Sequence, residues 1–238
     1  MNELKSFAVL LPDIPRWVET RGLLLSGRSE AFAAENGAVD FVVRALNGKL
    51  ICIVGKPARH LMEEAISKSV AAVEVLAVAE NGEHVASVLP GWRQSPALIH
   101  LLPEPIRVAV SHEVSFKFLQ RPEITRIREE VPQLSEELLE ALTFTEVAAV
   151  MVDERPVSFC YAGAETETWW DISIDTLPDY RRRGFAEQCV KFMIIHYLKL
   201  GKRPVWGAEE SNIASLNLAG KLGFKPVDQV VLFTRSGE

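Results

Sequence analysis

The clearest alternation of apolar and polar positions lies in the C-terminal half of the chain. Its apolar members are Trp170, Ile172 and Ile174, and its polar members are Asp171, Ser173 and Asp175. This period of two predicts a strand with one buried face, because successive side chains of a strand point to opposite sides. Pro178 and Asp179 follow shortly afterwards and favour a turn, so the strand must end before them.

Beyond this turn the apolar positions change to helical spacing. They are Ala186, Cys189, Val190, Met193, Tyr197 and Leu200. Gly201 follows and is expected to end the helix, because glycine readily takes the left-handed conformation that closes helices. The predicted order is therefore a strand, a turn with three arginines and a glycine, and a helix.

The turn at Arg181–Ala186 is a candidate anion site. A helix N-terminus leaves about four backbone N–H groups unpaired and carries partial positive charge. Gly184 would let a phosphate approach those donors closely, so we predict a pyrophosphate ligand. The turn lacks the Gly-Lys-Ser/Thr ending of a Walker loop and the three spaced glycines of a dinucleotide fingerprint. The alternative is that the three arginines form an ordinary solvated turn.

Two further segments follow at a regular distance. Residues 204–208 predict a short buried strand, and residues 212–224 predict a helix that ends at Gly223. The turn, written Arg181-x-x-Gly184-x-Ala186, resembles the CoA-pyrophosphate loop of the GNAT superfamily of acetyl-CoA-dependent acyltransferases. Residues 212–224 resemble that family's Asn-x-x-Ser/Ala-x-x-Leu-Tyr-x-Lys-x-Gly-Phe helix. The resemblance covers roughly residues 130–235.

The resemblance implies a site for acetyl-CoA as acyl donor. In the family, pantetheine passes between two splayed strands, and here Thr176 and Asn212 would hold it. The full set of implied cofactor-binding residues is Ile174, Thr176, Arg181, Arg182, Arg183, Gly184, Phe185, Ala186, Asn212 and Ser215. One departure from the family is Ala219, which stands where many members have a tyrosine that protonates the departing thiolate.

The function that the resemblance implies is N-acetyl transfer from acetyl-CoA to an amine, by direct transfer in a ternary complex. The acceptor would be a small-molecule or peptide amine. Asp171 is the first candidate for the base, and Glu209 is the second. The alternatives are that Asp171 is a structural carboxylate, and that the chain is a CoA-binding sensor or interaction module without turnover.

Four more side chains at or near the Trp170 strand bear on a site for the acceptor. Glu165 and Glu167 precede the Trp170 strand and are candidates for binding a cationic acceptor, although surface carboxylates are common in loops. Trp170 shares its strand face with Ile172 and is expected in the core. Trp169 lies on the other face and is expected to form a cavity wall.

The N-terminal half has mixed α+β patterning without a chemical motif. A hairpin is predicted at residues 39–54 around Asn47-Gly48, a helix after Pro57, and a second hairpin at residues 73–89 around Asn81-Gly82. Prolines at 90, 96, 103 and 105 suggest a boundary, so the chain divides into residues 1–105 and 106–238. The first part is either a degenerate copy of the acyltransferase fold or an unrelated packing or dimerisation domain, which would make a homodimer.

The remaining pattern completes an α+β fold for residues 106–238. Strands are predicted at residues 106–110 and 114–119, and a short helix capped by Ser135 follows. An antiparallel pair is predicted at residues 147–152 and 157–161, and a last strand at residues 230–233. This order of elements is that of the GNAT acyltransferase core, so we expect a mixed sheet with helices on it.

Composition narrows the function class further. The net charge of −6 argues against a general nucleic-acid partner, since such proteins are usually basic. Three scattered cysteines without a CxxC pair fit a reducing compartment. The chain shows no signal-peptide pattern and no apolar run of the ~18 residues that span a membrane. We expect a cytoplasmic protein, and the histidine spacing predicts no metal.

Overall fold

The computed structural model describes residues 3–34 and 39–235. The N-terminal half contains α1 (Glu3–Val9), η1 (Pro15–Trp17), α2 (Val18–Ser26), β1 (Ser29–Ala33), β2 (Phe41–Ala45), β3 (Leu50–Val54), α3 (Arg59–Ser67), β4 (Glu74–Val78), η2 (Ala79–Asn81), α4 (Gly82–Val88) and β5 (Trp92–Leu101). The C-terminal half contains β6 (Ser115–Phe118), α5 (Arg121–Thr125), α6 (Pro132–Ala141), β7 (Ala148–Val152), β8 (Arg155–Glu165), β9 (Trp169–Thr176), η3 (Pro178–Tyr180), α7 (Phe185–Lys199), β10 (Arg203–Glu209), α8 (Ile213–Leu222) and β11 (Lys225–Arg235).

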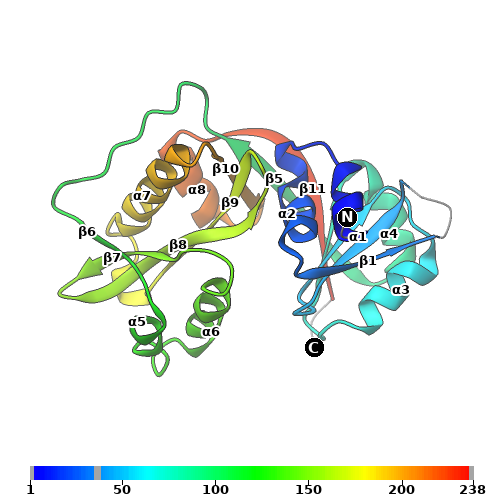
Figure 1. Cartoon of the computed structure of the whole chain (residues 1–238), viewed down its shortest axis with the longest axis horizontal. Coiled ribbons are helices and arrows are strands. Elements are labelled where there is room, and N and C mark those ends of the chain that lie inside the picture. Colours follow the sequence, from blue (N-terminus) through cyan, green and yellow to red (C-terminus); the bar gives the residue numbers. More distant parts are fainter. Residues whose placement is uncertain (1–2, 35–38, 236–238) are drawn as a thin grey trace.

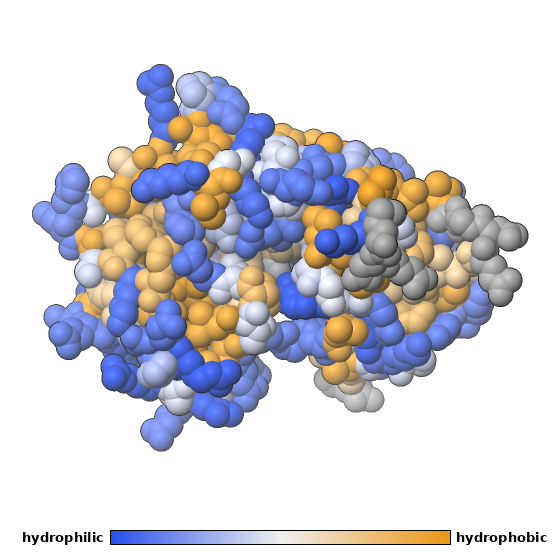
Figure 2. All heavy atoms as spheres, viewed as in Figure 1, coloured by the Kyte–Doolittle hydropathy of each residue, from blue (hydrophilic) through white to orange (hydrophobic). Residues whose placement is uncertain are grey.

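The two halves repeat one order of elements. Leaving aside β6 and the short 3₁₀ turns, each half runs through two helices, three strands, a helix, a strand, a helix and a strand. Figure 1 shows the halves as two lobes with β11 between them, and Figure 2 shows hydrophilic residues spread over both lobes on the same face. This repetition favours the prediction that the N-terminal half is a degenerate copy of the C-terminal fold.

The last strand of each half is inserted into the other half. Among the described residues, one sheet has the order β1-β2-β3-β4-β11-β5-β10-β9-β8-β7-β6. Strand β11 therefore pairs with β4 of the N-terminal half, and β5 pairs with β10 of the C-terminal half. The two exchanged strands also pair with each other, from Lys225↔Leu101 to Arg235↔Trp92. The sheet is thus continuous across the two halves.

Helices cover the two faces of the C-terminal sheet differently. On one face, α7 and α8 pack onto a core that includes Trp170, Ile172 and Trp206. On the other face, α2 of the N-terminal half contacts β8 and β9, where Val18 packs against Trp169. Because α2 lies between the lobes (Figure 1), it forms one wall of the space between them.

The structure confirms most predicted elements around the anion turn and the first hairpin. Strands β2 and β3 pair antiparallel as expected, and α3 buries Leu61, Met62 and Ala65. In the connecting turn, positive φ occurs at Gly48 and not at Asn47, whereas a two-residue type I′ turn needs positive φ at both central residues.

Three predictions were wrong. The second hairpin is absent, because residues 82–88 form α4, whose Val85 and Val88 lie three residues apart and bury one helical face. Residues 106–110 run irregularly between β5 and β6, with Ile106 packed on the core. Ser135 lies inside α6 and donates a hydrogen bond to the Ile124 carbonyl (3.2 Å), because Pro132 already opens that helix.

The exchange of β5 and β11 between the halves leads to a prediction for a chain that is cut between the two halves. A protease site placed between Pro105 and Ser111 would let the chain be cut where the halves are joined. Since β5 and β11 each lie among strands of the other half, we expect the two fragments to stay together and to unfold in one transition. Size-exclusion chromatography and thermal unfolding of the cut protein measure this.

The control is the fragment 106–238 alone, which lacks β5 and therefore leaves β10 and β11 without a shared neighbour. We expect it to aggregate, because exposed strand edges pair with other chains. Fragments that separate in dilute buffer, with each one folded, would contradict the role given to the exchanged strands.

Candidate active site

Strands β9 and β10 separate part-way along their length. Their parallel pairing begins at Arg203↔Trp169 and ends at Val205↔Asp171. Beyond that point, β9 continues to Thr176 along β8, and β10 continues to Glu209 along β5. The facing edges of the two strands therefore hold backbone groups that the sheet does not pair. Since backbone polar groups need partners, this wedge suits an extended ligand that carries amide groups.

The anion turn lies at the end of β9 and is built as the sequence predicts. Gly184 takes φ 84° and caps α7, and Arg182 also takes positive φ at 57°. The first hydrogen bond of the helix runs from the Gln188 N–H to the Gly184 carbonyl at 3.2 Å. Within the described chain, the N–H groups of residues 182–187 donate to no acceptor. They form a concentrated set of free donors.

The surroundings of this turn favour an anion. A Cβ built on Gly184 would meet no atom within 4 Å, so the space before the helix is open. Arg181, Arg182 and Arg183 are all exposed beside it. The Arg181 side chain also donates from Nε to the Thr176 carbonyl at 3.1 Å, which ties the turn to β9. Free donors, open space and positive charge together fit a phosphate group.

Four of the other predicted cofactor residues have side chains that are engaged within the fold. Thr176 Oγ1 lies 2.8 Å from Ser158 Oγ, and Ile174 packs on the core below α7. Asn212 caps α8 by accepting from the Ser215 N–H at 3.1 Å, and Ser215 Oγ accepts from Trp206 Nε1 at 2.9 Å. Their contact with a cofactor stays a prediction.

Asp171 lies at the point where the wedge begins. Burial raises the pKa of its carboxyl well above the ordinary value, and the nearby charge of Glu19 adds to this effect. Hydrogen bonding from the backbone N–H groups of Gly207 and Ile172 opposes the shift. Gly163 gives the carboxylate room, because a Cβ there would lie 3.3 Å from Asp171 Oδ2.

The same carboxyl faces a cavity of about 270 Å³ between the two halves. Glu209, the second candidate base, also lines this cavity, and its Oε2 is buried without a hydrogen-bond partner. The structure thus brings the two predicted bases to one place. The anion turn follows at the far end of β9, beyond Thr176.

Sequence reasoning missed two carboxylates of the N-terminal half that line this cavity. Glu19 comes from α2 and Glu74 from β4. Burial, and then the charge of Glu74, raises the pKa of Glu19 to about 7. Burial and the charge of Glu209 raise the pKa of Glu74, against the effect of Arg93. No local pattern marks these residues, because only the exchanged strands bring them near Asp171.

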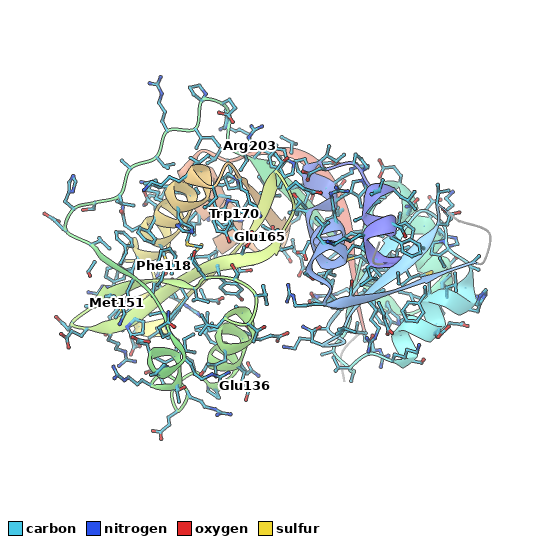
Figure 3. All side chains as sticks on the ribbon, in the orientation of Figure 1. Phe118, Glu136, Met151, Glu165, Trp170 and Arg203 are labelled. Atoms are coloured by element: carbon cyan, nitrogen blue, oxygen red, sulfur yellow. The ribbon has the colours of Figure 1, made fainter. Side chains whose placement is uncertain are left out.

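The remaining acceptor candidates have structural partners. Glu165 accepts from Lys202 Nζ at 2.6 Å and from the Tyr197 hydroxyl at 2.7 Å. Glu167 pairs with both ends of the Arg21 guanidinium. Their carboxylates are therefore occupied within the fold, and Figure 3 shows Glu165 in the C-terminal lobe near Trp170.

Trp169 and Trp170 are both buried, although the sequence predicts a cavity wall for Trp169 and a core position for Trp170. Trp170 is in the core, as expected, and stacks on Tyr197 with ring centroids 4.3 Å apart. Trp169 is not a cavity wall, because it packs on Val18, and its indole N–H donates to the Asp13 carbonyl at 3.1 Å. The N-terminal half covers this face of β9, which the sequence of the strand alone does not reveal.

Neither a metal site nor a membrane-spanning helix is found among the described residues. Among residues 3–34 and 39–235, no group of three or more His, Cys, Asp or Glu side chains is arranged to hold a metal ion. In the same described residues, every helix is too short or too polar to cross a membrane.

Comparison with known proteins identifies the fold. Residues 148–233 match the family model of the GNAT acetyltransferase. A GCN5-related N-acetyltransferase-like protein from Streptococcus suis has TM-score 0.72 and 18% identity, over 98% of both chains. A putative acetyltransferase of the GNAT family from Novosphingobium aromaticivorans has TM-score 0.64 and 19% identity, over 93% of this chain and 96% of its own. No curated protein matches the sequence.

These comparisons bear on different parts of the chain. The family match covers the wedge and the anion turn, so the resemblance seen in the sequence is confirmed. The structural matches extend over nearly the whole chain, the N-terminal half included. At such low identity they show the fold and leave the substrate open.

The buried carboxyl of Glu19 leads to a stability prediction. Glu19→Gln should stabilise the protein at pH 8 and change its stability little at pH 5. Because the folded-state pKa is raised to about 7, the contribution of this group is complete below its unfolded-state pKa and is lost as pH rises through about 7. At pH 8 glutamine removes a cost of about 1–3 kcal/mol from the charged form.

Urea denaturation of both proteins at the two pH values measures this difference. Glu83→Gln is the matched control, because Glu83 is exposed on α4 and does not line the cavity. Equal stability of Glu19→Gln and wild type at pH 8 would show that the Glu19 carboxylate is well solvated.

Proposed function

We propose that this chain, whose residues 148–233 match the GNAT acetyltransferase model and whose fold resembles solved GNAT proteins, transfers an acetyl group from acetyl-CoA to an amine. Transfer would be direct, with both substrates bound together. The observation that supports this most is the position of Asp171. It lies where β9 and β10 separate, and the anion turn follows the end of β9. Asp171 also lines the cavity that contains Glu19, Glu74 and Glu209.

The residues around the wedge fit acetyl-CoA, which supplies an activated acyl group as a thioester. The free N–H groups of residues 182–187 would hold the pyrophosphate, and Arg181–Arg183 would add positive charge. The unpaired edges of β9 and β10 would hold the amide groups of the pantetheine arm as an additional strand does.

Asp171 would act as the general base. An amine attacks as the free base, so its ammonium form must first lose a proton. A carboxylate with a raised pKa is a stronger base near neutral pH, and burial raises the pKa of Asp171. The ammonium would first give one proton to Asp171. As the C–N bond then forms and the C–S bond breaks, a second proton of the nitrogen goes to the departing thiolate.

No side-chain acid stands where many family members have a tyrosine. Ala219 occupies this position and is fully buried in the core with Trp206. Holding two reactants in the correct geometry can contribute roughly 7–11 kcal/mol, so transfer without this acid is chemically reasonable. Ala219 is also the observation that favours the second candidate, a CoA-binding protein without turnover. Release of CoA thiol with a panel of amines distinguishes the two.

Gly184→Asp should abolish CoA binding while the fold survives. The new carboxylate would enter the open space before α7 and repel the pyrophosphate. Aspartate is well tolerated at a helix N-terminus, although positive φ costs it roughly 1–2 kcal/mol. Titration calorimetry with CoA gives the affinity, and circular dichroism checks the fold.

Gly201→Asp is the matched control for this variant. Gly201 follows the other end of α7, has φ 76° and likewise has no atom within 4 Å of a built Cβ. It carries the same backbone strain and should bind CoA as wild type does. If folded Gly184→Asp protein bound CoA equally well, the turn could not be the pyrophosphate site.

Asp171→Asn should lower kcat/KM for acetyl transfer by about 10²–10⁴-fold, the usual contribution of a positioned base. Its affinity for acetyl-CoA should stay near the wild-type value, since the asparagine remains outside the anion turn. Steady-state kinetics and calorimetry on the same preparation measure both quantities.

Glu209→Gln is the comparison that assigns the base. It removes a carboxylate from the same cavity wall but away from the start of the wedge. If Glu209→Gln lost more kcat than Asp171→Asn, Glu209 would take the role of base instead.

A further inference from the structure

The cavity beside Asp171 contains carboxylates from both halves of the chain. They are Glu19 on α2, Glu74 on β4, Asp171 on β9 and Glu209 on β10. Strand β11 contributes to the wall between them, since Val230 and Leu232 also line the cavity. The exchanged strand thus makes one site from two halves.

Among the described residues these four groups are only partly compensated: Asp171 accepts from the backbone N–H groups of Gly207 and Ile172, and the charge of Arg93 acts on Glu74. No ion pair or side-chain hydrogen bond links any of them to a cation, and Glu209 Oε2 is buried without a hydrogen-bond partner. The nearest lysine and arginine at the cavity are engaged elsewhere. Lys49 pairs with Glu140 at 2.9 Å, and Arg16 pairs with Asp228 at 2.6 Å. Glu19 and Glu209 are partly buried and form no ion pair, and a carboxylate that is removed from water without a partner is costly, so this cavity favours a cationic ligand.

The walls between the carboxylates are aliphatic. They include Val18, Leu50, Leu76, Ile99, Val230 and Leu232. No aromatic side chain lines the cavity, so an aromatic ligand would find no stacking partner there. A volume of about 270 Å³ is also smaller than the usual 300–1,000 Å³ of sites for drug-sized ligands. The lining suits a short methylene chain.

We infer that the acyl acceptor is a short aliphatic diamine or polyamine, and that Glu19 and Glu74 bind its distal ammonium group. This inference rests on the proposed acetyl transfer. One nitrogen would lie at Asp171, which takes its proton, while the other stays charged. A monoamine of the same length would leave the second pair of carboxylates unpaired, so it would bind more weakly. The N-terminal half would then supply specificity for the acceptor.

The test uses the full chain and two matched probes, 1,4-diaminobutane and n-butylamine. Both have the same carbon chain, and n-butylamine also reproduces a lysine side chain. Calorimetry without acetyl-CoA should show at least about tenfold tighter binding of the diamine, as expected for one additional partly buried charge pair. Glu19→Gln and Glu74→Gln should each remove most of this preference, while Glu83→Gln should keep it.

Urea denaturation of the same Glu19→Gln and Glu74→Gln preparations shows whether a loss of binding comes from unfolding. Acetyl transfer to each probe is then followed by release of CoA thiol. Tighter binding of the diamine together with its acetylation supports the inference.

Two results would overturn the inference in different ways. Transfer to n-butylamine as efficient as transfer to the diamine would refute the acceptor class and leave the acetyltransferase function standing. Binding of both acetyl-CoA and the diamine without transfer to either probe would refute the proposed function, and with it the role of the diamine as acceptor.

Discussion

The antiparallel ladder between β5 and β11 is the interaction on which the whole molecule depends. Each strand closes the half to which the other belongs, because β11 lies between β4 and β5, and β5 lies between β11 and β10. Neither half has a complete sheet of its own. Strand β11 also supplies Val230 and Leu232 to the wall of the cavity that Asp171 and Glu19 line.

The two halves share their order of elements but differ at the turn before the long helix. In the C-terminal half, Gly184 leaves that space open. In the N-terminal half, the corresponding turn from β3 to α3 contains Gly55, and the Asp40 carboxylate fills the space. Asp40 Oδ1 accepts from the Lys56 N–H at 2.9 Å, and a Cβ on Gly55 would lie only 1.8 Å from it. An internal carboxylate thus occupies the position where the other half would receive a phosphate.

Under the proposed function, this difference gives the two halves separate roles, one in binding the acyl donor and one in binding the acceptor. The C-terminal half would bind the acyl donor with backbone N–H groups, which need no particular side chain. The N-terminal half would contribute acidic side chains to the acceptor cavity. Glu19 lowers the stability of the folded protein above about pH 7, since burial raises the pKa of its carboxyl to about 7. Such a cost at a binding site is common, because a ligand of opposite charge relieves it.

The features that the sequence predicted correctly depend on residues that lie close together along the chain. The strand before Pro178, the cap at Gly184 and the cap at Asn212 each depend on residues only a few positions apart, so the wedge and the anion turn were recognisable. The same local reasoning misread residues 82–88, because Val85 and Val88 suit a strand or a helix equally until a neighbouring surface selects one. Glu19 and Glu74 carry no local signal and lie 152 and 97 positions before Asp171. Only strand pairing across the whole chain brings them together, and long-range pairing of this kind depends on tertiary packing rather than on the neighbours in sequence.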